Sequence, residues 1–151
     1  MNFWLYKTEP SVYSIDDLKK DKITFWDGVR NYQARNFMRD AAVGDLVLFY
    51  HSNANPPGVA GVAKIVKPAF PDPTQFNKRS KYFDPKATKD EPRWFCPELR
   101  FVKKFGVPIG LDTLRDKKAL QDMVLLKRGS RLSIQPVSKK EYDTIIQLAD
   151  G

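Results

Sequence analysis

The sequence predicts an α+β domain: a curved, mixed or antiparallel sheet that can close partly into a barrel, with helices at its rim. Three observations predict this class. Runs rich in aromatic and branched residues outnumber the helical patterns, the helical patterns fall irregularly between them, and no repeat or linker divides the chain. At 151 residues, the chain has the length of one domain, residues 1–151, that buries its core without disulfides or metals.

The first third of the chain alternates short strands with capped helices. Residues 3–7 and 24–26 have the aromatic and branched side chains that favour strands. Ser14 begins a capping box and therefore predicts a short helix after it. Asn31 is expected to cap a second helix that runs to about Asp40 with one apolar face.

The middle of the chain predicts a pair of buried antiparallel strands. Residues 46–50 are continuously apolar, and residues 59–66 follow them after a polar loop with Pro and Gly. From residue 68 to residue 92 the sequence becomes irregular and contains five prolines. A segment of that length without regular structure is usually functional or mobile.

The last third predicts two strands and two helices. Residues 93–103 and 131–134 have strand patterns, and residues 111–115 predict a short helix. Residues 123–126 are apolar and fit either type. Ser138 opens a clear capping box, so a final helix is expected after it.

Composition narrows the classes of function. The chain has 26 Lys and Arg against 18 Asp and Glu, which gives a net charge of +8. This charge favours an anionic partner such as nucleic acid. Many small proteins are equally basic and have no such partner. Cys96 is the single cysteine and His51 the single histidine, so we expect no disulfide, metal cluster or cofactor. The start lacks a signal peptide, and no apolar run reaches the roughly 20 residues of a membrane span. These features predict a cytoplasmic protein with no membrane partner.

Residues 25–36 are the most informative segment for function. They place the flat ring of Trp26 beside a turn, two guanidinium groups and several amides. A stacking face with hydrogen-bonding edges and positive charge suits a planar polar ligand on an anionic chain, such as a nucleobase. The alternative is that Trp26 is a core residue, as buried aromatic side chains are common.

Catalysis has weaker support. Cys96 lies in a predicted strand, where a buried inert thiol is expected. His51 could act as a general base, but its neighbours Ser52 and two asparagines suit ligand binding equally well. No phosphate loop and no carboxylate cluster is present in the sequence. We therefore predict a binding module and not an enzyme.

Several segments, in order along nearly the whole chain, resemble the EVE domain, the family of the thymocyte nuclear protein, which is related to the YTH and ASCH domains. The segments include WLYKTEP at residues 4–10 and WDGVRNYQARN at residues 26–36, followed by residues 44–52, 57–61, 92–94, 123–126 and 131–137. The resemblance implies a PUA-like pseudo-barrel. It also implies a module that reads a flipped, modified base, chiefly modified cytosine in DNA, in an aromatic pocket.

Residue by residue, the resemblance and the sequence pattern predict two groups of site residues. The base pocket is expected to contain Trp26 as stacking ring with Lys7, Thr8, Asn31, Tyr50, His51, Ser52, Gly58, Val59, Ala60 and Gly61. The phosphate-binding group is expected to contain Arg30, Arg35, Asn36, Arg39, Lys78, Arg79 and Lys81. By analogy with YTH domains, one of three phenylalanines would complete the pocket: Phe70, Phe76 or Phe83.

Other functions stay open at this point. A PUA-like fold also suits a reader of modified tRNA or rRNA. A small nucleotide-processing hydrolase that uses His51 is the alternative from a different class. The sequence predicts a monomer, leaves the type of modification undetermined, and is compatible with a sensor whose effector is a separate protein.

Overall fold

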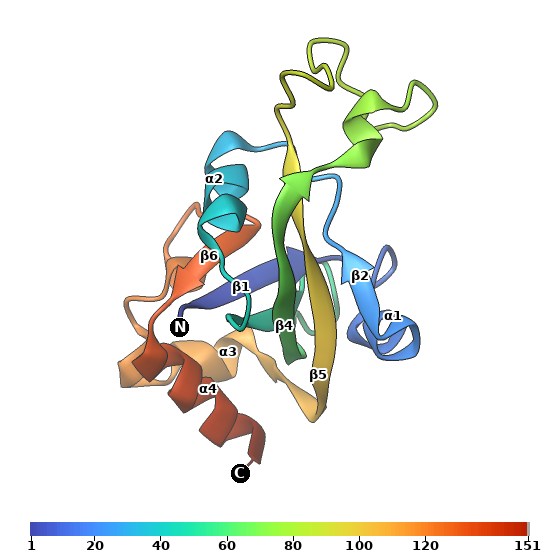
Figure 1. The fold of residues 1–151 in the computed structure, drawn as a ribbon. Helices are drawn as coiled ribbons and strands as arrows, with labels where there is room; N and C mark the ends of the chain where they lie inside the picture. The colour runs from blue at the N-terminus through green and yellow to red at the C-terminus, as the bar shows by residue number, and fades with distance from the viewer. Residues whose placement is uncertain (151) are drawn as a thin grey trace.

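The computed structural model describes residues 1–150 and confirms an α+β fold with one curved sheet of six strands (Figure 1). The strands are β1 (Phe3–Thr8), β2 (Ile23–Phe25), β3 (Leu46–His51), β4 (Gly58–Pro71), β5 (Phe95–Gly110) and β6 (Ile134–Val137). The helices are α1 (Ile15–Asp21), α2 (Tyr32–Asp40), α3 (Leu111–Arg115) and α4 (Lys139–Asp150). Three short 3₁₀ turns, at Pro73–Phe76, Lys118–Leu120 and Val124–Leu126, complete the elements.

The sheet is mixed, with the strand order β2-β5-β4-β3-β1-β6. β1 runs parallel to β3, and every other neighbouring pair is antiparallel, including the expected pair β3 and β4. The register between β4 and β5 shifts four times along their length. Because each such irregularity increases the local twist, the two long strands coil around each other as Figure 1 shows.

Both faces of the sheet are covered, and the alternation of side chains along β1 shows why. Trp4 and Tyr6 point into a core closed by α1 and α2, whereas Leu5 points into a second core closed by α3 and α4. A strand buried on both faces needs apolar side chains on both, and β3 is likewise apolar from Leu46 to Tyr50. In the part of the chain that the structure describes, no helix is long and apolar enough to cross a membrane.

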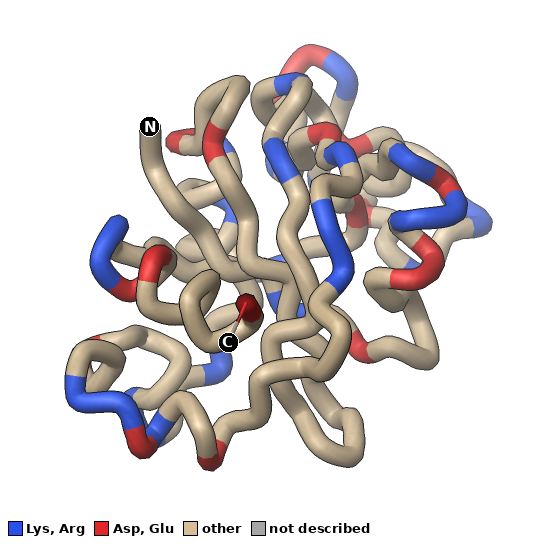
Figure 2. Tube along the Cα trace, turned by 90° about the horizontal axis from the view of Figure 1, so that it is seen from below, with Lys and Arg blue, Asp and Glu red and all other residues tan. Residues whose placement is uncertain are grey.

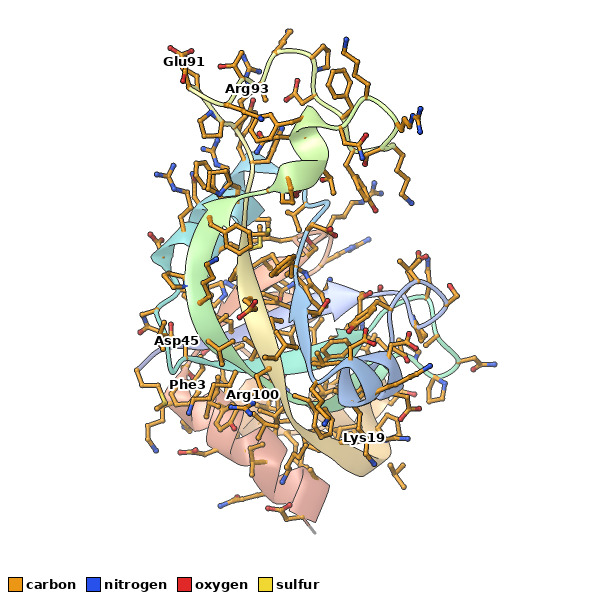
Figure 3. All side chains as sticks on the ribbon, turned by 45° about the vertical axis from the view of Figure 1, so that its right-hand side comes forward. Phe3, Lys19, Asp45, Glu91, Arg93 and Arg100 are labelled. Atoms are coloured by element: carbon orange, nitrogen blue, oxygen red, sulfur yellow. The ribbon has the colours of Figure 1, made fainter. Side chains whose placement is uncertain are left out.

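Several boundaries differ from the expected ones. β4 continues to Pro71 and β5 to Gly110, because each supplies the hydrogen-bonding partners of the other beyond its apolar stretch. β6 covers residues 134–137 and not 131–134, and it tolerates Pro136 because it is an edge strand. The irregular segment is thus shorter than expected. The segment between β4 and β5, residues 72–94, forms the protrusion at the top of Figure 1. Figure 3 shows Glu91 and Arg93 there, distant from Lys19 and Arg100.

Helix capping follows the sequence closely. Ser14 and Asp17 form the reciprocal hydrogen bonds of a capping box before α1, and Ser138 and Glu141 do the same before α4. The Asn31 side chain accepts a hydrogen bond from the Ala34 N–H at 2.9 Å and begins α2 as predicted. These caps satisfy backbone donors that a helix leaves unpaired at its start.

Candidate base-binding pocket

A cavity of about 720 Å³ opens where the end of β1 faces the turn after β2. It is lined by Lys7 and Thr8 of β1, by residues 12–13, by the whole segment 24–31, and by Lys81, Tyr82 and Ser133. Segments that are distant in sequence thus meet around one space, which has the volume of a small-molecule or nucleobase site.

Trp26 is both a core residue and part of the wall of this cavity. Its ring packs 5.5 Å from the ring of Tyr6 and 5.4 Å from that of Phe49, and Tyr13 meets it edge-on. Only 9% of Trp26 is exposed. Its backbone N–H donates to the Pro97 carbonyl at 3.0 Å. The two interpretations of Trp26 therefore do not exclude each other, since packing on its neighbours holds the ring still where it borders the cavity.

The turn after Trp26 is tied to the protrusion by one buried carboxylate. Asp72 is 1% exposed and accepts from the Gly28 N–H at 2.8 Å, from the Arg30 guanidinium at 3.2 Å and from Thr74. Gly28 has a φ of +81°, a conformation that glycine adopts without strain. The shape of the cavity wall therefore depends on Asp72, which lies 44 residues beyond Gly28.

Arg30 is a structural cross-link and does not extend toward a phosphate. All three of its guanidinium nitrogens donate hydrogen bonds, to the carbonyl oxygens of Val29 and Tyr82 and to Asp72 and Thr74. The guanidinium also lies 5.4 Å from the ring centre of Tyr82 and 5.3 Å from that of Trp94. Its donors are occupied within the protein, so the expected phosphate contact is not what this geometry provides.

Tyr82 is the aromatic residue that the protrusion contributes to the cavity. A Cβ added at Gly28 would lie 2.7 Å from its ring, so the absence of a side chain at Gly28 allows this close approach. Of the three phenylalanines expected in this place, none lines the cavity, and Phe70 instead packs edge-on against Phe25 at 5.2 Å. No local pattern marks Tyr82 in the sequence, because the hydrogen bonds from Arg30 to its carbonyl hold this part of the loop.

Polar groups of both signs border the cavity. Burial lowers the pKa of the Lys7 ammonium. Burial, followed by the nearby charge of Asp72, raises the pKa of Asp27. Asn31 uses its side-chain oxygen to cap α2, so its amide nitrogen is the group with hydrogens to donate. The cavity thus offers a carboxylate acceptor and two donor groups, a set that can read the edge of a planar base. Within residues 1–150, no group of three His, Cys, Asp or Glu is placed to hold a metal ion.

Tyr50, His51 and Ser52 do not line the cavity. Tyr50 is buried in the core on the opposite face of the sheet. His51 accepts a hydrogen bond from the Ile15 N–H at 3.1 Å through Nε2, and burial lowers its pKa, which favours the neutral ring. The Ser52 N–H donates to the Thr8 carbonyl at 2.9 Å. His51 therefore holds the start of α1. Burial raises the pKa of the Cys96 thiol, which disfavours the reactive thiolate. These positions do not suggest a nucleophile and base that act together.

The segment Gly58–Gly61, which was expected in the base pocket, does not line the cavity. A Cβ added at Gly58 or at Gly61 would lie 2.4 Å from a carbonyl oxygen of β5. Val59 and Ala60 are buried in the two opposite cores. The small residues here serve the close approach of β4 and β5, which the sequence pattern does not distinguish from the close approach of a ligand.

We expect Gly61→Ala to destabilise the domain without changing its ligand preference. The new methyl group would meet the Lys103 carbonyl and the Ile15 side chain, and overpacking of this kind costs about 1–3 kcal/mol. Thermal unfolding followed by circular dichroism measures the loss. Gly106→Ala is the matched control, because a Cβ there meets nothing within 4 Å. Equal midpoints for the two variants would contradict the packing explanation.

The remaining basic residues are spread over separate surfaces. Arg35 donates to the Arg93 carbonyl at 2.9 Å and to Asn36, and the guanidinium of Arg39 lies 4.4 Å from the ring centre of Phe95. Lys78 and Arg79 are exposed on the protrusion, and only Lys81 of that group lines the cavity. Figure 2 shows Lys and Arg in short groups along the Cα trace, with Asp and Glu near several of them.

Comparison with known proteins gives consistent relatives. The family model described as the EVE domain matches residues 2–148. Human thymocyte nuclear protein 1 is 43% identical over 97% of this chain and 73% of its own length. A solved Leishmania major protein is 49% identical with a TM-score of 0.95, covering 99% of this chain and 95% of its own. Human THYN1 protein, solved in complex with DNA that contains 5-methylcytosine, is 41% identical with a TM-score of 0.92 over 100% of this chain and 99% of its own. The chain belongs to the EVE domain family.

Proposed function

We propose that this protein binds DNA and reads a modified cytosine that is flipped out of the strand and inserted into the cavity beside Trp26. The observation that carries the proposal is the cavity itself, with the immobilised ring of Trp26, the ring of Tyr82 and polar groups of both signs around about 720 Å³. The human relative solved with DNA that contains 5-methylcytosine supports the choice of ligand.

The energies involved are large enough for such a protein to discriminate methylated from unmethylated cytosine. Flipping a base costs a few kcal/mol, and stacking on an aromatic side chain returns about 1–3 kcal/mol. Burying one additional methyl group contributes about 0.8 kcal/mol, which corresponds to a preference of about fourfold. Larger preferences require hydrogen bonds to the base edge as well, and Lys7, Asp27 and Asn31 are the side chains in place for them.

The direct test is fluorescence-anisotropy binding to matched single- and double-stranded oligonucleotides that carry cytosine, 5-methylcytosine or 5-hydroxymethylcytosine, with an RNA counterpart, at two salt concentrations. The proposal expects tighter binding to one modified DNA. Tighter binding to the RNA would favour an RNA reader instead. Weak binding that ignores the modification and fades with salt would overturn the proposal.

We further propose a binding module without catalysis, located in the cytoplasm and active as a monomer. His51 already serves as a hydrogen-bond acceptor for α1, and the single cysteine is buried. Turnover of a nucleotide by the wild-type protein that disappears in His51→Ala would contradict this part of the proposal.

Asp27 is expected to distinguish cytosine from thymine. A carboxylate accepts a hydrogen bond from the amino group of cytosine, whereas thymine presents an oxygen at the same position. 5-Methylcytosine and thymine carry the same methyl group, so this pair of ligands isolates the contact. We expect Asp27→Ala to reduce the discrimination between them by about 1–3 kcal/mol. The matched control is Asp122→Ala, which alters an exposed carboxylate outside the cavity. An unchanged ratio of the two dissociation constants in Asp27→Ala would refute the assignment.

A further inference from the structure

A second groove, which we call the rim groove, adjoins the cavity. Lys7, Thr8 and Ser133 line both spaces, whereas Ser52, Ser130 and Arg131 line only the rim groove. Its volume is about 690 Å³. Because the two spaces share a wall, the rim groove is a neighbouring space that a sugar and phosphate can reach from a base in the cavity.

The walls of the rim groove are attached to the end of β1. The Lys7 N–H donates to the Ser133 carbonyl at 2.8 Å, and the Ser52 N–H donates to the Thr8 carbonyl at 2.9 Å. Two loops that are distant in sequence are thereby held on either side of one strand end. Both loops that form the rim groove are therefore anchored to the sheet by backbone hydrogen bonds.

The loop on one side of the rim groove is rich in positive charge. Residues 127–131 read Lys-Arg-Gly-Ser-Arg, and Gly129 has a φ of +78° in a turn that the Ser130 N–H closes on the Lys127 carbonyl at 3.2 Å. Within residues 1–150, none of the three basic side chains takes part in an ion pair. The acidic group in the groove, Glu9, accepts a hydrogen bond from the Asn53 amide at 2.5 Å.

We infer that the rim groove holds the phosphodiester attached to the inserted nucleotide, with Arg131 as the cation that contacts its oxygens. This inference rests on the proposed function for the position of the base. Arg131 is exposed and lines the groove, and a guanidinium binds phosphate oxygens through two parallel hydrogen bonds. Arg30 and Arg35, near α2, are less suited to this contact, because both already donate to carbonyl groups of the protein.

The test compares Arg131→Ala with two other arginine variants in the full chain. Affinities for methylated and unmethylated DNA are measured over a series of salt concentrations. We expect Arg131→Ala to weaken both by the same factor and to reduce the slope of log K against log salt by about one, with the methylation preference retained. Arg100→Ala is the matched control, because this exposed residue lies on β5 outside both spaces. It is expected to leave the slope unchanged.

Each outcome separates this inference from the proposed function. If wild-type protein shows no methylation preference but Arg131→Ala still lowers the salt slope, the rim groove binds phosphate and the base-reading proposal fails. An unchanged slope in Arg131→Ala, with a reduced slope in Arg79→Ala on the protrusion, would overturn the rim-groove assignment and leave the base-reading proposal intact. Thermal unfolding of Arg131→Ala should match wild type, since the side chain is exposed.

Discussion

Replacement of Trp26 by alanine is expected to abolish the discrimination between methylated and unmethylated cytosine while much salt-dependent background binding remains. The indole borders the cavity and packs on Tyr6 and Phe49, so its removal eliminates both the stacking face and the rigidity of that wall. Loss of stacking alone costs about 1–3 kcal/mol for a bound base. Anisotropy binding to the matched oligonucleotides measures the effect, and an equal loss of affinity for both would contradict it.

Truncation of a buried tryptophan also destabilises a domain by about 3–5 kcal/mol, so a milder variant must accompany the alanine variant. Trp26→Phe keeps an aromatic ring of smaller area and is expected to reduce the preference in part. Trp94→Phe is the matched control: its indole donates to Asp84 at 2.8 Å and does not line the cavity. Its methylation preference should equal that of wild type even where its unfolding midpoint falls.

The second large effect is expected for Asp72→Ala. This buried carboxylate accepts hydrogen bonds from Gly28, Arg30 and Thr74, and its removal leaves the partly buried Arg30 guanidinium without its counter-charge. Loss of one partner of a buried ion pair costs about 3–5 kcal/mol. The turn after Trp26 and the ring of Tyr82 lose their common anchor, so we expect lower stability together with weaker DNA binding.

Chemical denaturation and anisotropy binding, measured on the same preparations, test this expectation. Asp84→Ala is the matched control from the same segment, because it removes only the hydrogen bonds from the Trp94 indole and the Lys86 N–H and leaves the Asp72 contacts in place. A loss of about 1 kcal/mol is typical of each such bond, so the total is expected to stay below that of Asp72→Ala. Equal losses in the two variants would show that Asp72 is not the anchor of the cavity wall.

Much of the local structure could be predicted from the sequence. The caps at Ser14, Asn31 and Ser138 and the buried strand β3 lie where the patterns predict them. These features depend on interactions between residues that are close in sequence, or on burial that shows directly as an apolar run. The ends of the strands were less predictable. β4 and β5 pair with each other beyond their apolar stretches, at polar positions whose residues have no strong preference for strands.

The candidate site divides in the same way. The resemblance and the local pattern point to Trp26, Lys7, Thr8, Asn31 and Lys81, all of which line the cavity. Tyr82 and Asp27 were missed, and Gly58–Gly61, Tyr50 and His51 have structural positions elsewhere. An aromatic ring or a small residue suits a ligand site and a packed core equally well, so its type alone does not decide between them.

The sequence by itself therefore determined the class of the fold, its caps and the segment around Trp26 that forms most of the cavity wall. Only the tertiary structure decided which distant groups complete that wall, and which basic residues have donors occupied within the protein. The physical reason is that Arg30 meets Asp72 and Tyr82 across more than 40 residues, and Lys7 meets Ser133 across the whole domain. Such pairings are set by the packing of the complete chain, and no local pattern records them.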